Sequence, residues 1–228
     1  MMDYPGTDGQ AAARLSDRPD WGYLLREVYE IYRDAGAGGS EAIRHHQRLV
    51  REAISRTMRA NARLIDREPE TKPVCRHLKR ALDLGRLHKT APFIRTIESV
   101  SDHLAWLWGY DEDELPRRLF DGFAWAETAG PSGPVESREV ILGLVLFAPG
   151  TRYPAHHHEG IAESYYVLAG SVSQNDDGVF APGSMMFNPP GRRHRITVGG
   201  RDPALLAYAW IGPEDALAGQ KLSFKRAD

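Results

Sequence analysis

The second half of the chain consists of short runs of β-forming residues that turn signals interrupt every few positions. Two examples are the runs Val140–Ala148 and Ala204–Ile211, and the clearest hairpin turn is Asp177-Gly178. Closely spaced strands with such turns are typical of antiparallel sandwiches and barrels. The turn-rich stretch 130–134 precedes these runs. The pattern therefore predicts a β unit over residues 131–228.

The first half has a different periodicity. Apolar residues such as Leu24, Val28 and Ile31 recur at helical spacing, and Ser40 is placed to cap a second helix that we expect to extend to about Arg67. Further helices are predicted after Pro73 and over residues 92–108. Residues 1–19 are rich in Gly, Asp and Ala and lack periodicity, so we expect a mobile tail there. The prediction is an α+β protein: an N-terminal helical region at 20–130, then a C-terminal antiparallel β-barrel of jelly-roll type.

Composition narrows the classes of function. The formal net charge is −2, which gives no general electrostatic reason to bind nucleic acid or an anionic membrane. The longest apolar run, Val140–Ala148, is too short to cross a bilayer. Cys75 is the single cysteine, so an intramolecular disulfide is excluded and a reducing compartment is favoured. We therefore predict a soluble cytoplasmic protein, and self-association is left open.

One segment of the β unit has the pattern of a metal site. Because side chains alternate along a strand, His156 and His158 point the same way and His157 points the other way. Glu163 follows five residues later, and His194 is a fourth ligand candidate downstream. Three imidazoles and one carboxylate suit a divalent first-row ion such as Fe, Mn, Zn, Ni or Co. An octahedral ion with four protein ligands keeps two positions for water or substrate, which is a catalytic arrangement.

Two tyrosines accompany these ligands. Tyr165 shares the face of Glu163, so it is predicted on the metal side, and Tyr166 is predicted on the opposite side. Tyr153 has the wrong parity for the face of His156, although Pro154 could break the regular pleat between them.

The motifs resemble those of the cupin superfamily. The first cupin motif, G-x5-HxH-x3,4-E-x6-G, is met from Gly150 to Gly170. The second, G-x5-PxG-x2-H-x3-N, is met from Gly183 to His194, and Val198 replaces its final Asn. The resemblance implies a cupin barrel that holds one metal ion.

A narrower resemblance is to the dimethylsulfoniopropionate (DMSP) lyase cupins, in their DddL-like branch. Their signature looks like Y-x-A-H-x-H-x-A-E-E-x-Y-x-x-L-x-G, and it is similar to the run from Tyr153 to Gly170, with one extra residue before Glu163 and with Ala162 in place of the first Glu. This resemblance implies β-elimination of DMSP to dimethyl sulfide and acrylate. It implies Tyr165 as a metal-activated base and Tyr153 as a second acid/base or substrate contact. Aromatic candidates to hold the cationic sulfonium are Trp210, Tyr208 and Phe187.

Other functions fit the same ligands. A cupin dioxygenase would use Fe(II) and oxygen. A non-enzymatic cupin would sense a metal or ligand through its helical region. A cupin isomerase or epimerase acting on sugars could also use a tyrosine base.

Overall fold

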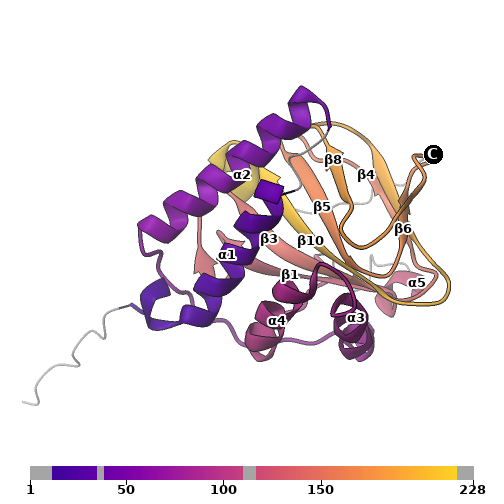
Figure 1. Cartoon of the computed structure of the whole chain (residues 1–228), viewed down its shortest axis with the longest axis horizontal. Helices are drawn as coiled ribbons and strands as arrows, with labels where there is room; N and C mark the ends of the chain where they lie inside the picture. The colour runs from indigo at the N-terminus through magenta and orange to yellow at the C-terminus, as the bar shows by residue number, and fades with distance from the viewer. Residues whose placement is uncertain (1–11, 35–38, 110–116, 220–228) are drawn as a thin grey trace, which may run out of the picture.

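The computed structural model describes residues 12–34, 39–109 and 117–219 of the chain (Figure 1). Nearly all helices precede the strands, as the periodicity predicts. The helical elements are η1 (Leu15–Asp17), α1 (Pro19–Asp34), α2 (Glu41–Arg59), η3 (Pro73–His77), α3 (Leu78–Gly85), α4 (Ala91–Val100), η4 (Ser101–His103), α5 (Arg117–Phe120) and α6 (Glu214–Ala218). None of the described helices combines the length and the apolar character that a membrane span needs.

The strands form two sheets. A six-stranded sheet has the order β2-β1-β3-β10-β5-β8, and a four-stranded sheet has the order β4-β9-β6-β7. All pairs are antiparallel except β1 with β2, which is parallel. The strands are β1 (Phe123–Gly130), β2 (Val135–Glu136), β3 (Ile141–Phe147), β4 (Arg152–His156), β5 (Ala162–Ala169), β6 (Val172–Gln174), β7 (Val179–Phe180), β8 (Met185–Asn188), β9 (His194–Val198) and β10 (Ala204–Ile211).

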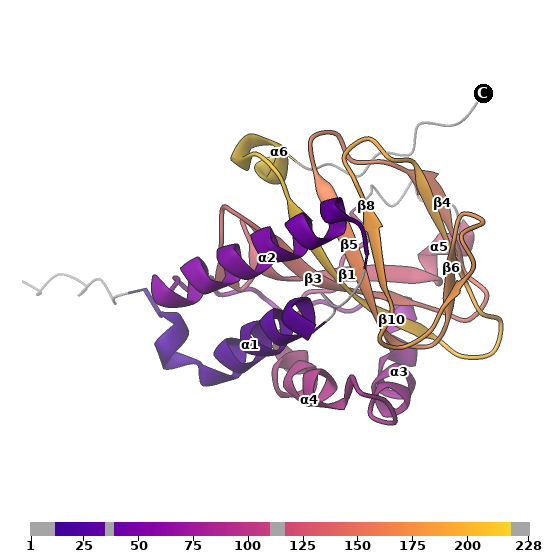
Figure 2. The same cartoon turned by 45° about the horizontal axis from the view of Figure 1, so that its top comes forward.

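The molecule has three layers. Helices α1 and α2 cover one face of the six-stranded sheet, and the four-stranded sheet lies on its other side (Figures 1 and 2). Strand alternation divides the apolar residues between two cores. Leu142, Leu144 and Leu146 face the helices, whereas Val145 and Phe147 face the space between the sheets. Two facing sheets of this kind are a jelly roll, so the predicted α+β class is confirmed and the barrel takes the form of two sheets.

The second helix is shorter than predicted. Ser40 caps α2 as expected, with its hydroxyl accepting from Ile43 N, but the helix ends at Arg59 and not at Arg67. Asn61 adopts a left-handed conformation with φ 48°, which asparagine tolerates better than most residues. Its side chain exchanges hydrogen bonds with Ser16, at 2.8 and 3.0 Å. Asn61 N donates to Met58 O and Ala62 N donates to Thr57 O, so a local backbone cap ends the helix at this asparagine.

The sheet begins before the predicted boundary. The expected helix over 92–108 ends at Val100, and Leu107 pairs with Trp125 of β1. Strand β1 lies before residue 131 and was missed, because its Ala and Glu residues are poor strand formers and it is buried on both faces. The β unit therefore starts at Phe123.

Part of the predicted tail is ordered. Residues 1–11 lie outside the described residues, but Arg14 bridges to Arg63 and Leu15 is buried against the helices. The expectation of a mobile tail up to residue 19 is therefore wrong for residues 14–19.

Candidate metal centre

Three strands bring the four predicted ligands together between the sheets. His156 ends β4, Glu163 lies near the start of β5, and His194 begins β9, directly opposite His156 in the ladder. His158 follows β4 in the connecting loop. One nitrogen or oxygen from each of the four side chains lies within 4.8 Å of the others, and all four residues are buried. Ligands on opposite sides of a metal ion at about 2.1 Å are about 4 Å apart, so this spacing suits a single ion.

Backbone carbonyls fix the orientation of two imidazoles. The Nδ1–H of His156 donates to Pro154 O at 3.0 Å, and the Nδ1–H of His194 donates to Arg192 O at 3.1 Å. Each ring therefore carries its hydrogen on Nδ1 and turns Nε2 toward the cluster. Such a second hydrogen bond sets the tautomer and raises the basicity of a ligating histidine.

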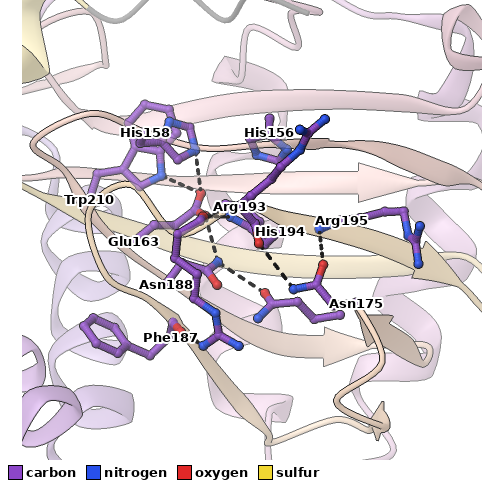
Figure 3. Close-up of polar contacts among 12 residues, drawn as sticks. His156, His158, Glu163, Asn175, Phe187, Asn188, Arg193, His194, Arg195 and Trp210 are labelled. Carbon is purple, nitrogen blue, oxygen red and sulfur yellow. Dashed lines mark hydrogen bonds and ion pairs between the residues drawn. The ribbon is translucent and has the colours of Figure 1, made fainter. Parts of the chain in front are cut away.

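The carboxylate of Glu163 is held from both sides. Trp210 Nε1 donates to Oε1 at 2.7 Å, and Asn188 Nδ2 donates to Oε2 at 3.1 Å (Figure 3). The two donors are the direct neighbours of Glu163 in the sheet, on β10 and β8. Asn188 also donates to Gln174 at 3.2 Å. The indole N–H of Trp210 thus positions a ligand, a role that the sequence reading did not assign to it.

The electrostatics of the cluster suit a bound cation. Burial alone would raise the pKa of Glu163, but the neighbouring His158 and His194 hold that pKa well below its usual range. Burial, together with His194, lowers the pKa of His156 to about 4, so its imidazole is neutral. His194 Nε2 lies 2.8 Å from the Glu163 carboxylate, yet this buried nitrogen makes no hydrogen bond within the described residues. An anionic carboxylate beside the neutral imidazole of His156, with His158 and His194 in the same cluster, is a donor set that suits a divalent ion.

Tyr165 lies where alternation predicts. It is buried on the same inner face as Glu163, and its ring centroid is 6.2 Å from that of His194. It lines a cavity together with His156, His158 and the predicted aromatic contacts Tyr208 and Trp210. Burial and then the Glu163 carboxylate raise the pKa of Tyr165 well above its usual value. Without a cation, its hydroxyl is therefore a neutral phenol.

Tyr153 also reaches this cavity, despite its parity. The ladder between β4 and β9 has an irregularity between Tyr153 and His156, where Pro154 lies. The extra residue turns Tyr153 inward, and its ring meets His156 edge-on with the centroids 4.9 Å apart. The expected break at Pro154 is confirmed.

The structure separates Phe187 from the other predicted substrate contacts. Phe187 pairs with Ser164 in the ladder, so it faces the helices. Its ring packs on His46 with centroids 5.0 Å apart and points away from the metal ligands (Figure 3). The prediction that Phe187 contacts substrate is therefore wrong. The sequence of β8 alone does not show which of its faces points to the metal cluster, because that depends on the register of β8 with β5.

Sequence reasoning missed two groups around the ligands. The sequence around Asn188 gives no sign of a role at the site beyond its place before Pro189-Pro190. Its contact with Glu163 depends on the register of β8 with β5. On the helix side of β5, the Ser164 hydroxyl lies 2.7 Å from Tyr32 Oη and 2.7 Å from His46 Nε2. His46 is a buried link between α2 and the strand that carries Glu163.

The fold and the cluster define the class: a jelly-roll cupin with a buried site that fits one divalent metal ion. A family model described as dimethylsulfoniopropionate lyase matches residues 45–206. A protein of Cereibacter sphaeroides, whose name proposes it to be the DMSP lyase DddL, is 47% identical over 215 residues, covering 93% of this chain and 92% of that protein.

Two solved structures share the fold. One is described as crystal structures of the DMSP lyases RdDddP and RnDddQII, with TM-score 0.68, 23% identity, and coverage of 91% of this chain and 99% of that chain. The other is DMSP lyase DddQ from Ruegeria pomeroyi, with TM-score 0.64, 20% identity, and coverage of 86% and 92%. The chain belongs to the dimethylsulfoniopropionate lyase family, a family of carbon–sulfur lyases.

Proposed function

We propose that the protein splits DMSP into dimethyl sulfide and acrylate by β-elimination, with one divalent transition-metal ion in the cluster and Tyr165 as the base. The supporting observation is the position of Tyr165, which is buried beside Glu163 in the wall of a cavity that two of the histidines also line. Family membership and the names of the relatives describe the same reaction.

The reaction requires a base next to the substrate carboxylate. Tyr165 oxygen takes a proton from the carbon beside that carboxylate. The electron pair of the broken C–H bond forms the C=C bond, the C–S bond breaks, and sulfur leaves as a neutral sulfide. When bound, a divalent cation stabilises negative charge beside the carboxylate as a Lewis acid and favours the phenolate form of a nearby tyrosine.

Other residues would bind the metal ion, hold the Glu163 carboxylate in place and surround the sulfonium. His156, His158, Glu163 and His194 would bind the ion, and Trp210 and Asn188 fix the carboxylate of Glu163. The rings of Tyr208 and Trp210 offer π faces to the sulfonium.

The rest of the cavity wall is suited to exclude water from the site. Phe123, Val145 and Phe147 make much of that wall apolar. Tyr153 is the candidate for a second acid/base.

The ion we propose is Fe, Mn, Zn, Ni or Co, because mixed imidazole and carboxylate ligands suit all of these. Cytoplasmic localisation, a small zwitterionic substrate without nucleic acid, and self-association stay predictions from the sequence. An Fe(II) dioxygenase would use the same ligands, and oxygen uptake with a candidate substrate would separate it from a lyase.

The test is headspace detection of dimethyl sulfide after DMSP is mixed with the metal-loaded protein. We expect release by the wild type, and loss of both bound metal and release in His194→Ala. The matched control is His157→Ala, because His157 is half-exposed and pairs with Glu159 instead of the cluster. Full metal content in His194→Ala would show that His194 is not a ligand, and no dimethyl sulfide from the loaded wild type would refute the activity.

A further inference from the structure

A second cavity adjoins the one at the metal ligands. The metal-side cavity, which His156, His158 and Tyr165 line, has a volume of about 30 Å³. That is room for one or two water-sized groups, such as an end of a carboxylate. The adjoining cavity, which we call the Glu127 cavity, has a volume of about 110 Å³. Trp125, Tyr208 and Trp210 line both cavities, so the two cavities adjoin at these three rings.

A row of residues across the sheet connects the two cavities. Tyr165 of β5 is the ladder partner of Tyr208, Tyr208 is the partner of Gly143, and Gly143 is the partner of Glu127. A Cβ at Gly143 would lie 2.5 Å from Tyr208 Cζ and 2.4 Å from Ala126 O, so no other residue leaves room for the ring here. The ring of Tyr208 therefore lies over β3, between the predicted base and Glu127.

Glu127 gives the Glu127 cavity a negative wall. It is the charged residue among those that line this cavity within the described structure, and Ser132 N donates to its Oε1 at 2.8 Å. Burial raises the pKa of Glu127 to about 7, although the backbone N–H groups of Ser132 and Gly133, and then the charge of Arg67, favour the ionised form. Burial and then the nearby Glu127 carboxylate raise the pKa of Tyr208, one of the shared rings, well above its usual value. A cation in this cavity would relieve the cost of burying the charge.

We propose that the Glu127 cavity is the subsite for the onium group of a short zwitterionic carboxylate, and that Glu127 selects for the positive charge. The inference rests on the proposed function, because it assumes that the carboxylate of the substrate lies at the cluster. The cluster then binds the negative end of the ligand, and Trp125, Tyr208, Trp210 and Glu127 surround the positive end. A sulfur with two methyl groups is too large for the metal-side cavity and fits the larger one.

The selection has a kinetic signature that separates it from a structural role. Sulfur loses its positive charge as the C–S bond breaks, so attraction by Glu127 is stronger in the bound substrate than in the transition state. Glu127→Gln should therefore raise KM about tenfold and leave kcat unchanged or higher. A variant that merely loosens the fold would lower kcat.

Binding of an isosteric pair tests the charge preference directly. The metal-loaded full chain is titrated calorimetrically with 3-(trimethylammonio)propionate and with 4,4-dimethylpentanoate, which differ in the charge of one central atom. We expect the wild type to prefer the onium ligand about tenfold. Glu127→Gln should lose this preference and bind the neutral ligand as before, whereas Glu127→Asp should keep most of it. The control is Glu139→Gln, which removes one exposed carboxylate that pairs with Arg56.

Each outcome has a defined meaning. Equal binding of both ligands by the wild type, or an unchanged preference in a folded Glu127→Gln, would overturn the subsite. If Glu127→Gln does not fold, the wild-type preference and Glu127→Asp decide. Dimethyl sulfide release without an onium preference refutes the subsite and leaves the proposed function standing. An onium preference without dimethyl sulfide release refutes the proposed function and leaves the subsite standing.

Discussion

Glu163 and Ser164 are neighbours in β5, yet they lie in opposite cores of the molecule. Glu163 and Tyr165 face the space between the sheets, where buried histidines and aromatic rings surround them. Ser164 and Tyr166 face the helices, where Ser164 contacts Tyr32 and His46. Both faces are buried, and both contain hydrogen-bonded polar groups. One face is arranged around a place for a cation, and the other holds the helices to the sheet. The difference shows that burial and polarity alone do not mark a functional site.

The different roles of the two faces of β5 are tested most directly by the same substitution on each face. Tyr165→Phe should lower dimethyl sulfide release by about 10²–10⁴-fold and keep the metal, because it removes the base alone. Tyr166→Phe, the adjacent residue on the helix side, should stay within a few fold of the wild type. Headspace analysis and elemental analysis of both variants provide the measurement. Near-normal release by Tyr165→Phe would end its assignment as the base.

The helix side should respond to pH through His46. Burial lowers the pKa of His46 to about 4. The unfolded chain, with an ordinary pKa near 6.5, then binds a proton that the folded state does not bind between these values. The resulting stability is present above pH 6.5 and is lost as the pH falls toward 4, by about 3 kcal/mol in total.

Urea unfolding of the metal-free protein between pH 7 and pH 5 measures this loss, since metal release is then absent. His46→Gln should show a shallower decline than the wild type. Parallel declines would show that His46 is not the group that titrates.

Trp210 does not belong to the candidate ligand set, but its indole N–H holds the carboxylate of Glu163. Trp210→Phe keeps an aromatic ring and removes the N–H that donates to Glu163 at 2.7 Å. We expect metal affinity to fall about 10–100-fold, the usual cost of losing such a supporting hydrogen bond. Competition with a chelator measures it. An unchanged affinity would leave Trp210 as a cavity wall alone.

The smallest expected effect is on stability alone. Ser164→Ala leaves the buried hydroxyl of Tyr32 and Nε2 of His46 without their shared partner. The free energy of unfolding should fall by about 1–2 kcal/mol, while metal affinity should not change. A clear loss of metal in this variant would mean that the helix side controls the position of Glu163, and the two faces would no longer be independent.

Sequence alternation was sufficient for the centre of the site because it is a local property. It paired His156 with His158 and Glu163 with Tyr165, and the structure brings these residues together, although His158 lies in the loop after β4. Local patterns failed where a distant partner decides the outcome. Leu107 pairs with Trp125 where a helix was predicted, and the register of β8 with β5 turns Phe187 toward the helices.

The residue order alone determined the helical and β halves, the candidate ligand set and the inner face of β5, because periodicity and spacing act over a few residues. Only the tertiary structure decided which strands are neighbours. Register places Trp210 and Asn188 on either side of Glu163, sends Phe187 to the helices, and aligns Tyr165, Tyr208 and Glu127 in one row. These pairings depend on packing between segments far apart in the chain, and a slip of one residue would move each side chain to the other face.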